Sequence, residues 1–244
     1  MNLAIIGSGG REHSICYKLK QSSKAKKIFC IPGNAGTQKI AHNIQEDISN
    51  FDAIYKIIKK HKIDLIIIGP EQPLVDGMVD YFNKKKINIF GPDKFASQLE
   101  GSKAFMKNLC IKNNIPTAKF EVFDNFEDIS NFIKKNKTPI VVKADGLAAG
   151  KGVTICNSSE EALKNAKEIL NGKFKTSNKV VLEELLQGEE LSYFIIADEE
   201  SYQFFGSAQD HKRVGEGDTG PNTGGMGAYS PSPLLTKDLE KKIK

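Results

Sequence analysis

Short apolar runs alternate with longer amphipathic stretches over the first hundred residues. Residues 63–68 are largely apolar, as expected for a strand whose two sheet faces are both covered, and Phe51, Ile54, Ile57 and Ile58 share one helical face. The pattern predicts strands at residues 3–6, 28–31, 63–68 and 87–90, and helices ending near residue 20 and at 51–61 and 75–85. It is typical of a doubly wound, Rossmann-like α/β domain, whose ligands bind beyond the carboxyl ends of the strands. We place this domain at residues 1–100.

A different pattern follows residue 100, in which strands are joined mainly by loops. It predicts strands at residues 140–143, 153–156, 179–184, 191–197 and 202–206, and helices at 102–113, 159–170 and 236–244. Residues 215–233 are rich in Gly, Pro, Ser, Thr and Asn and predict a long ordered loop or lid. Strand–loop–strand connections favour a mainly antiparallel α+β unit. We divide it into residues 101–190, which include a flap loop, and residues 191–244, the start of a second half.

Composition excludes several classes of function. The net charge of +5 comes from lysines that are spread along the chain without interleaved aromatic residues, so we expect no nucleic-acid partner. The apolar runs are shorter than the roughly 20 residues of a membrane span, and a strand pattern begins at residue 2, so we expect a cytoplasmic protein without a signal peptide or a membrane partner. The four cysteines form no CxxC pair, which favours reduced, buried thiols over a zinc site.

Only two of the 35 basic residues are arginines, Arg11 and Arg213. Both lie in polar segments that contain glycine. A guanidinium binds carboxylate or phosphate through two parallel hydrogen bonds, which an ammonium cannot do. The two arginines are therefore candidate anion-binding residues, unless their retention is chance.

Two glycine-containing turns follow the first two predicted strands. GSGGREH (residues 7–13) begins like a dinucleotide-binding loop, but Glu12 replaces the third glycine and no acid ends the second strand. We therefore favour an anion site made by free N–H groups at a helix N-terminus, with Arg11 beside it. PGNAGT (residues 32–37) is a candidate second backbone cradle. The alternative is two ordinary tight turns.

Two later segments suggest nucleotide binding. DGLAAGKG (residues 145–152) is one residue short of a Walker A loop, has Gly152 where Ser or Thr would hold magnesium, and precedes a strand. We interpret it as a flap whose amides close over phosphates, with Lys151 adding charge and Lys143 reaching the nucleotide from the strand end. VVLEELLQGEE (residues 180–190) is a strand running into an acidic link, whose backbone suits an adenine and whose Glu190 suits ribose hydroxyls.

These residues carry a resemblance to a known family. The matching stretches are GSGGREH (7–13), PGNAGT (32–37), GPEQPLVDG (69–77), LEGSKAF (99–105), IPTA (115–118), VVKADGLAAGKGV (141–153), EELLQGEE (183–190) and QDHKRVGEGDTGPNTGGMGAYSP (209–231). The chain resembles the ATP-grasp enzymes, and among them the phosphoribosylamine–glycine ligases (glycinamide ribonucleotide synthetases), from residue 1 to about residue 233. The resemblance implies a pre-ATP-grasp Rossmann-like domain followed by an incomplete α+β ATP-grasp domain.

The resemblance also implies a reaction and its residues. Glycine would be phosphorylated by ATP, with Mg²⁺ or Mn²⁺, and the amine of 5-phosphoribosylamine would displace phosphate from the glycyl phosphate. Lys143 and Arg213 are the expected catalytic residues, although Arg213 could instead fix the 214–231 loop; His211 is expected to be structural. The expected ATP-binding residues are Lys103, Lys143, Gly146, Gly150, Lys151, Gly152, Glu183, Glu184, Leu186 and Glu190. The expected substrate-binding residues are Gly9, Gly10, Arg11, Glu12, His13, Pro32, Gly33, Asn34, Asp210, Lys212 and Arg213.

The sequence departs from the family at its end. The glutamate and asparagine with which the family binds magnesium are not found, and neither is its last small domain, so we expect no metal ligands within residues 1–244 and ligands downstream of Lys244. We accordingly expect a fragment that binds ATP weakly and turns over negligibly. The remaining alternatives are a non-catalytic nucleotide-binding fragment, another ATP-grasp carboxylate–amine ligase of purine metabolism, and a dehydrogenase.

Overall fold

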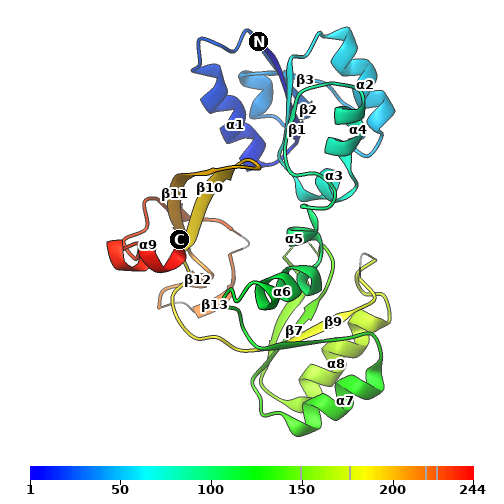
Figure 1. Ribbon diagram of the computed structural model, residues 1–244, viewed down its shortest axis with the longest axis vertical. Helices are drawn as coiled ribbons and strands as arrows, with labels where there is room; N and C mark the ends of the chain where they lie inside the picture. The colour runs from blue at the N-terminus through cyan, green and yellow to red at the C-terminus, as the bar shows by residue number, and fades with distance from the viewer. Residues whose placement is uncertain (149, 176, 218, 224) are drawn as a thin grey trace. The chain divides into compact units, whose positions relative to one another are not determined.

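Five parallel strands form the first sheet of the computed structural model (Figure 1), which describes residues 1–148, 150–175, 177–217, 219–223 and 225–244. The strand order is β3-β2-β1-β4-β5, which confirms the predicted doubly wound domain. The strands are β1 (Asn2–Gly7), β2 (Lys27–Pro32), β3 (His42–Asn43), β4 (Leu65–Ile68) and β5 (Ile89–Phe90). The parallel pairing brings the carboxyl ends of β1, β2 and β4 to one edge of the sheet.

Helices cover both faces of this sheet because the apolar side chains of each strand alternate between them. Leu3 and Ile5 of β1 pack with Cys16 on one face, whereas Ala4 and Ile6 pack with Ile54 on the other. The helices are α1 (Gly10–Lys20), α2 (Phe51–Lys60), α3 (Glu71–Val75) and α4 (Met78–Lys84), and Thr37–Lys39 form the short 3-10 helix η1.

The prediction of one helix at residues 75–85 is wrong over its first turn. Val75 ends α3, and α4 begins only at Met78. Between them Gly77 has φ of +92°, a left-handed conformation that glycine adopts readily and that interrupts a right-handed helix. The apolar periodicity alone did not reveal this break.

The second sheet is antiparallel, with strand order β6-β9-β7-β8, which confirms the predicted antiparallel pairing. Its strands are β6 (Phe120–Phe123), β7 (Ile140–Ala144), β8 (Val153–Cys156) and β9 (Val180–Glu184). The accompanying helices are α5 (Gln98–Gly101), α6 (Lys103–Lys112), α7 (Phe126–Lys135) and α8 (Ser159–Leu170). Side chains of β7 and β9 on one face pack with α7 and α8 in a single core, and these two helices lie side by side (Figure 1).

The sequence analysis missed β6 and α7. The signal for α7 was present: Asn125 caps the helix by accepting from the N–H of Asp128, two acidic residues follow in its first turn, and Ile129 and Ile133 are buried on one face. β6 carried a weaker signal, because its alternate residues are only partly buried.

Residues 1–185 form one compact unit, and Leu186–Lys244 form a second. In the second unit, a hairpin of β10 (Ser192–Ala197) and β11 (Tyr202–Asp210) is extended by β14 (Ala228–Tyr229), and β12 (Arg213–Gly215) pairs with β13 (Thr219–Asn222). The prediction of a long loop at 215–233 is therefore wrong in part, because short strands were hidden among its glycines. Helix α9 (Lys237–Ile243) follows the cap residue Thr236. In the described part of the chain, no helix is long and apolar enough to cross a membrane.

Replacing Ile133 with Ala tests the packing of α7 against the second sheet. The Ile133 side chain is 1% exposed within that core, so the substitution should lower the free energy of unfolding by about 2–5 kcal/mol. Lys134→Ala is the matched control because Lys134 is exposed on the same helix, and it should change the free energy by less than about 0.5 kcal/mol. Urea denaturation followed by circular dichroism measures both variants, and equal effects would contradict the assigned core.

Candidate functional site

The antiparallel sheet has one face against α7 and α8 and an opposite face on which two charged side chains stand among apolar ones. Val142 and Leu182 point into the core with α7 and α8, so the alternation of a strand turns Lys143 and Glu183 to the opposite face. In the ladder Val141 pairs with Glu183 and Lys143 pairs with Val181. Lys143 and Glu183 are therefore diagonal neighbours on adjacent strands.

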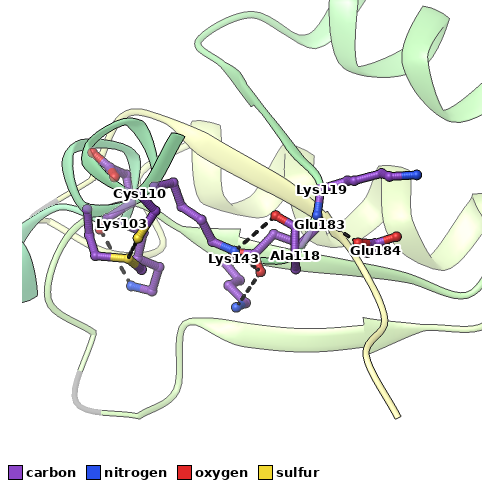
Figure 2. A network of polar contacts seen from close by, with 10 residues as sticks. Lys103, Cys110, Ala118, Lys119, Lys143, Glu183 and Glu184 are labelled. Carbon is purple, nitrogen blue, oxygen red and sulfur yellow. Dashed lines mark hydrogen bonds and ion pairs between the residues drawn. The ribbon is translucent and has the colours of Figure 1, made fainter. Parts of the chain in front are cut away.

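Glu183 is the centre of a buried ionic cluster (Figure 2). Its Oε2 lies 2.9 Å from Lys143 Nζ and 2.9 Å from Lys107 Nζ, which comes from α6. The Lys107 ammonium also donates to the carbonyl oxygen of Ala118 at 3.4 Å and lies 5.5 Å from the centre of the Phe120 ring. Two ammonium groups and one carboxylate are thus held together, and of the three side chains only that of Lys143 is appreciably exposed.

The second carboxylate oxygen of Glu183 has a different environment. Among the described residues, Oε1 is buried and has no hydrogen-bond partner. A buried acceptor without a donor is costly, and such atoms occur at sites that receive a ligand. The free lone pairs of Oε1 are suited to an N–H donor.

The first turn of α6 is attached to the start of the loop between β7 and β8. The Asp145 carboxylate accepts from the backbone N–H of Ala104 at 2.7 Å and from the Ser102 hydroxyl at 3.1 Å. Lys103 Nζ in turn donates to the carbonyl oxygen of Gly146 at 3.1 Å. This network fixes the Lys103 ammonium at the base of the predicted flap (Figure 2).

The predicted flap, residues 145–152, connects the paired strands β7 and β8; Ala149 lies outside the described residues. Gly146 and Gly152 are buried, whereas Gly150 and Lys151 are exposed. A Cβ at Gly152 would lie 2.6 Å from the Cβ of Ala148, so a larger residue there would force the turn open. Close packing thus explains the glycine at 152, whereas Gly150 has open space around it and adopts a φ of +74° that favours glycine.

The flap and the acidic link leave the sheet at opposite ends. β7 and β9 are antiparallel, so that Ala144 beside the flap pairs with Val180, while Glu184 beside the link pairs with Ile140. At about 3.3 Å per residue, the two ends are separated by roughly 13 Å. The Glu184 side chain is exposed, and its Oε1 accepts from the N–H of Lys119 at 2.8 Å. Glu183 and Glu184 therefore do not share a face, although both were predicted to bind ATP.

The turns after β1 and β2 meet at the carboxyl edge of the parallel sheet, as expected. Asn34 joins them: its Nδ2 donates to the carbonyl oxygen of Ser8 at 2.8 Å, and its Oδ1 accepts from the N–H groups of Gly36 and Thr37. Gly33 N–H also donates to the carbonyl oxygen of Gly7 at 3.1 Å. GSGGREH and PGNAGT thus form one polar surface, which includes the exposed residues Gly9 and Gly10 and the half-buried residues Pro32 and His13.

Glu12 and Arg11 are engaged within the protein, and the N–H of Gly9 is not among the free N–H groups predicted at this helix N-terminus. The buried Glu12 carboxylate accepts from the N–H of Gly9 at 2.5 Å and so caps α1. Arg11 donates through Nη1 to the carbonyl oxygen of Gly69 and pairs through Nη2 with Glu71 at 2.9 Å. The guanidinium therefore links α1 to the turn after β4, and it remains more than half exposed.

The second unit holds the other predicted residues. Lys212 Nζ pairs with Glu190 at 2.6 Å and with Asp210 at 3.1 Å, and both carboxylates raise the pKa of the Lys212 ammonium. Arg213 donates to the carbonyl oxygen of Gly220 at 3.0 Å, as the alternative of a loop-fixing arginine requires. Leu186 is 65% exposed. The His211 ring packs 5.6 Å from that of Tyr229.

Comparison with known proteins decides the family. Residues 1–100 match the family description "Phosphoribosylglycinamide synthetase, N domain", and residues 101–244 match "Phosphoribosylglycinamide synthetase, ATP-grasp (A) domain". The chain belongs to the phosphoribosylglycinamide synthetase family. This confirms the resemblance and, with the two sheets, the predicted fold class.

Individual relatives agree with the family assignment. The phosphoribosylamine–glycine ligase of Haemophilus influenzae is 46% identical over all of this chain and 58% of its own length. The crystal structure of the Thermotoga maritima phosphoribosylamine–glycine ligase is 35% identical, with a TM-score of 0.83 over all of this chain and 58% of that one. A Campylobacter jejuni biotin carboxylase structure, 17% identical with a TM-score of 0.77, covers 99% of this chain and 56% of its own and shares the fold. The chain thus spans under three fifths of these proteins.

The motifs of this phosphoribosylglycinamide synthetase chain did not reveal the structural roles of two residues at the site, Lys107 and Asp145. Lys107 stands four residues after Lys103, hence one turn further along the same helical face. Asp145 was noted as part of the flap, but its hydrogen bond from the N–H of Ala104, in the first turn of α6, depends on a contact across 41 residues. No local sequence pattern identifies these partners, which are Glu183 for Lys107 and the N–H of Ala104 for Asp145.

The described residues do not fit a divalent cation at this face. Mg²⁺ and Mn²⁺ prefer carboxylate and carbonyl oxygens, yet three lysines dominate the face, and Oε2 of the buried Glu183 already faces two of them. Within the described ranges, no three His, Cys, Asp or Glu side chains gather in a metal-binding group. No step proposed below depends on a metal.

The pH dependence of stability tests the environment of Lys103. Burial lowers the pKa of its ammonium, with the Asp145 carboxylate opposing and the Lys143 ammonium adding to the effect. Between the lowered pKa and the ordinary value near 10.5, the unfolded chain binds more protons, so stability contributed by Lys103 rises with pH in that window. The free energy of unfolding of the wild type, relative to Lys103→Met, should therefore increase as pH rises toward 10.5. Parallel urea titrations measure it; a constant difference would show that the Lys103 pKa is not lowered.

Proposed function

We propose that this chain supplies the nucleotide-binding and sugar-phosphate-binding parts of a ligase that joins glycine to 5-phosphoribosylamine. A glycine carboxylate oxygen attacks the γ-phosphorus of ATP, ADP leaves, and the product is glycyl phosphate. The amine of 5-phosphoribosylamine then attacks the carbonyl carbon, phosphate leaves, and a proton is lost from nitrogen. Membership of the phosphoribosylglycinamide synthetase family and the names of the relatives support this proposal.

The observation that carries the proposal is the charged cluster on the face of the antiparallel sheet opposite α7 and α8. Lys103 and Lys143 present two ammonium groups beside the flap, and Oε1 of Glu183, which has no hydrogen-bond partner in the described part of the chain, lies on the same face. The two cations suit the ATP phosphates, where charge develops during phosphoryl transfer. Oε1 suits the exocyclic amine of adenine. Gly146–Gly152 would cover the phosphates and exclude the water that would hydrolyse the acyl phosphate.

The carboxyl edge of the parallel sheet is the proposed site of 5-phosphoribosylamine. The exposed Gly10 at the start of α1 and the exposed part of the Arg11 side chain would face its phosphate. The N–H groups of Gly9, Gly33, Gly36 and Thr37 already donate within the protein. In the second unit we assign Glu190 to the ribose of ATP, Asp210 and Lys212 to the substrates, and Arg213 to the transferring phosphoryl group. Mg²⁺ or Mn²⁺ as companion of ATP and a cytoplasmic location belong to the same proposal.

Substitution of Lys143 tests the nucleotide site in the full polypeptide. Lys143→Ala removes a charged hydrogen bond to phosphate, typically about 1.5–3 kcal/mol, and should raise the apparent KM for ATP about 10- to 100-fold. ADP release that depends on both glycine and 5-phosphoribosylamine is the assay. Lys112→Ala, an exposed position on α6, should leave KM unchanged. An unchanged KM for ATP in Lys143→Ala would show that Lys143 does not contribute to the nucleotide site. Release of ADP by the wild type in the absence of glycine would refute the proposed reaction.

Arg11→Lys tests the sugar-phosphate site. A lysine cannot reproduce the paired contacts of the guanidinium with Gly69 and Glu71, so the KM for 5-phosphoribosylamine should rise by about tenfold, as for the loss of roughly 1.4 kcal/mol, while the KM for glycine changes little. Steady-state kinetics with each substrate varied in turn separates the two. Equal increases in both constants would contradict a phosphate role for Arg11.

A further inference from the structure

Lys107 is a buried lysine that the proposed reaction does not yet use. Its side chain is 5% exposed, and it stands one helical turn beyond Lys103 on α6. Lysine is almost never buried to this degree without a partner. The partner here is the carboxylate of Glu183, 2.9 Å away.

The cluster contains two cations for one anion, and the two cations differ in exposure. Both ammonium groups approach the same atom, Oε2 of Glu183. The Glu183 side chain is 4% exposed and that of Lys107 is 5% exposed, whereas that of Lys143 is 24% exposed. Lys107 is further held by the Ala118 carbonyl and the Phe120 ring. Lys143 is therefore the cation that can turn toward a ligand, and Lys107 is the one that stays.

We infer that Lys107 is a positioning residue, the permanent counter-ion of Glu183, and that it makes Lys143 available to the phosphates of the nucleotide. The inference rests on the proposed function, since it takes Lys143 as a phosphate-binding residue. With Lys107 present, Lys143 can leave Glu183 without exposing a buried, uncompensated carboxylate. With Lys107 absent, Glu183 retains Lys143, because an unpaired buried charge is strongly unfavourable.

The release of Lys143 from Glu183 should affect the binding of the phosphates and not the binding of the base or the ribose. Adenosine has the base and the ribose but no phosphate, so the ratio of the dissociation constants of adenosine and ATP isolates the phosphate contribution. Lys107→Met should lower this ratio at least tenfold. Lys107→Arg keeps the charge and should hold the ratio within threefold of the wild type. Isothermal calorimetry on the full polypeptide measures both ligands, and thermal melting confirms that each variant is folded.

The double variant Lys107→Met/Glu183→Gln shows whether Lys107 acts through Glu183. With no carboxylate left to retain Lys143, the ratio should return to within threefold of the wild type. Replacing both members of a buried ion pair by neutral groups is tolerated better than removing one, so this variant remains informative if Lys107→Met alone does not fold. Lys112→Met is the matched control on the exposed side of α6 and should match the wild type.

Three results would contradict the proposed role of Lys107. A ratio that stays low in the double variant would show that Lys107 contacts the phosphates itself, which overturns a role through Glu183. A ratio that is unchanged in a folded Lys107→Met protein also overturns it, while leaving the proposed function intact. Failure of the wild type to bind ATP would overturn the proposed nucleotide site, and the inference with it.

Discussion

A carboxylate buried on a sheet face, neutralised by two ammonium groups, determines the arrangement of the antiparallel half of the first unit. Glu183 comes from β9, Lys143 from β7 and Lys107 from α6. The cluster therefore requires β7 and β9 to pair in the observed register and α6 to pack against them. Removing one member of such a cluster typically costs about 3–5 kcal/mol, because its partner is left uncompensated. The same cluster fixes α6 over the sheet, and α6 in turn carries Lys103 to the flap through the contacts of Asp145. The side chains that hold these elements together therefore include those that we propose for nucleotide binding.

Much of this fold could be predicted from the sequence because its signals are local. The apolar runs of β1, β2 and β4 and the spacing of Ile54 and Ile58 specify a doubly wound sheet, and Ser158 followed by two glutamates marks the start of α8 as the structure has it. Gly77 shows where local signals fail: an apolar pattern continues across it, and only the left-handed backbone reveals that the helix is interrupted. The short strands β13 and β14 lie among glycines, where composition predicts a loop.

The candidate site was predictable in its residue types and less so in its contacts. Lys103, Lys143 and Glu183 were identified from motifs, and the structure places their side chains around one face. The burial of Lys107 and its pairing with Glu183 depend on packing between α6 and β9. The two residues are 76 positions apart in the sequence, and no local pattern specifies their contact. Arg11 and Glu12 were predicted to bind substrate, and in the structure both contact the protein's own turns: Glu12 caps α1, and Arg11 bridges to Gly69 and Glu71. Their binding roles remain predictions.

The antiparallel relation of β7 and β9 has a consequence for how a nucleotide could be recognised. Because the flap leaves one end of this strand pair and the acidic link leaves the other, a nucleotide that touches both would have to lie along the strands. Lys143 and Glu183 stand between these two ends and are joined by an ion pair. A substitution that alters the phosphate contacts of the proposed site would therefore also alter its contact with the base, so the two halves of the recognition would have to change together.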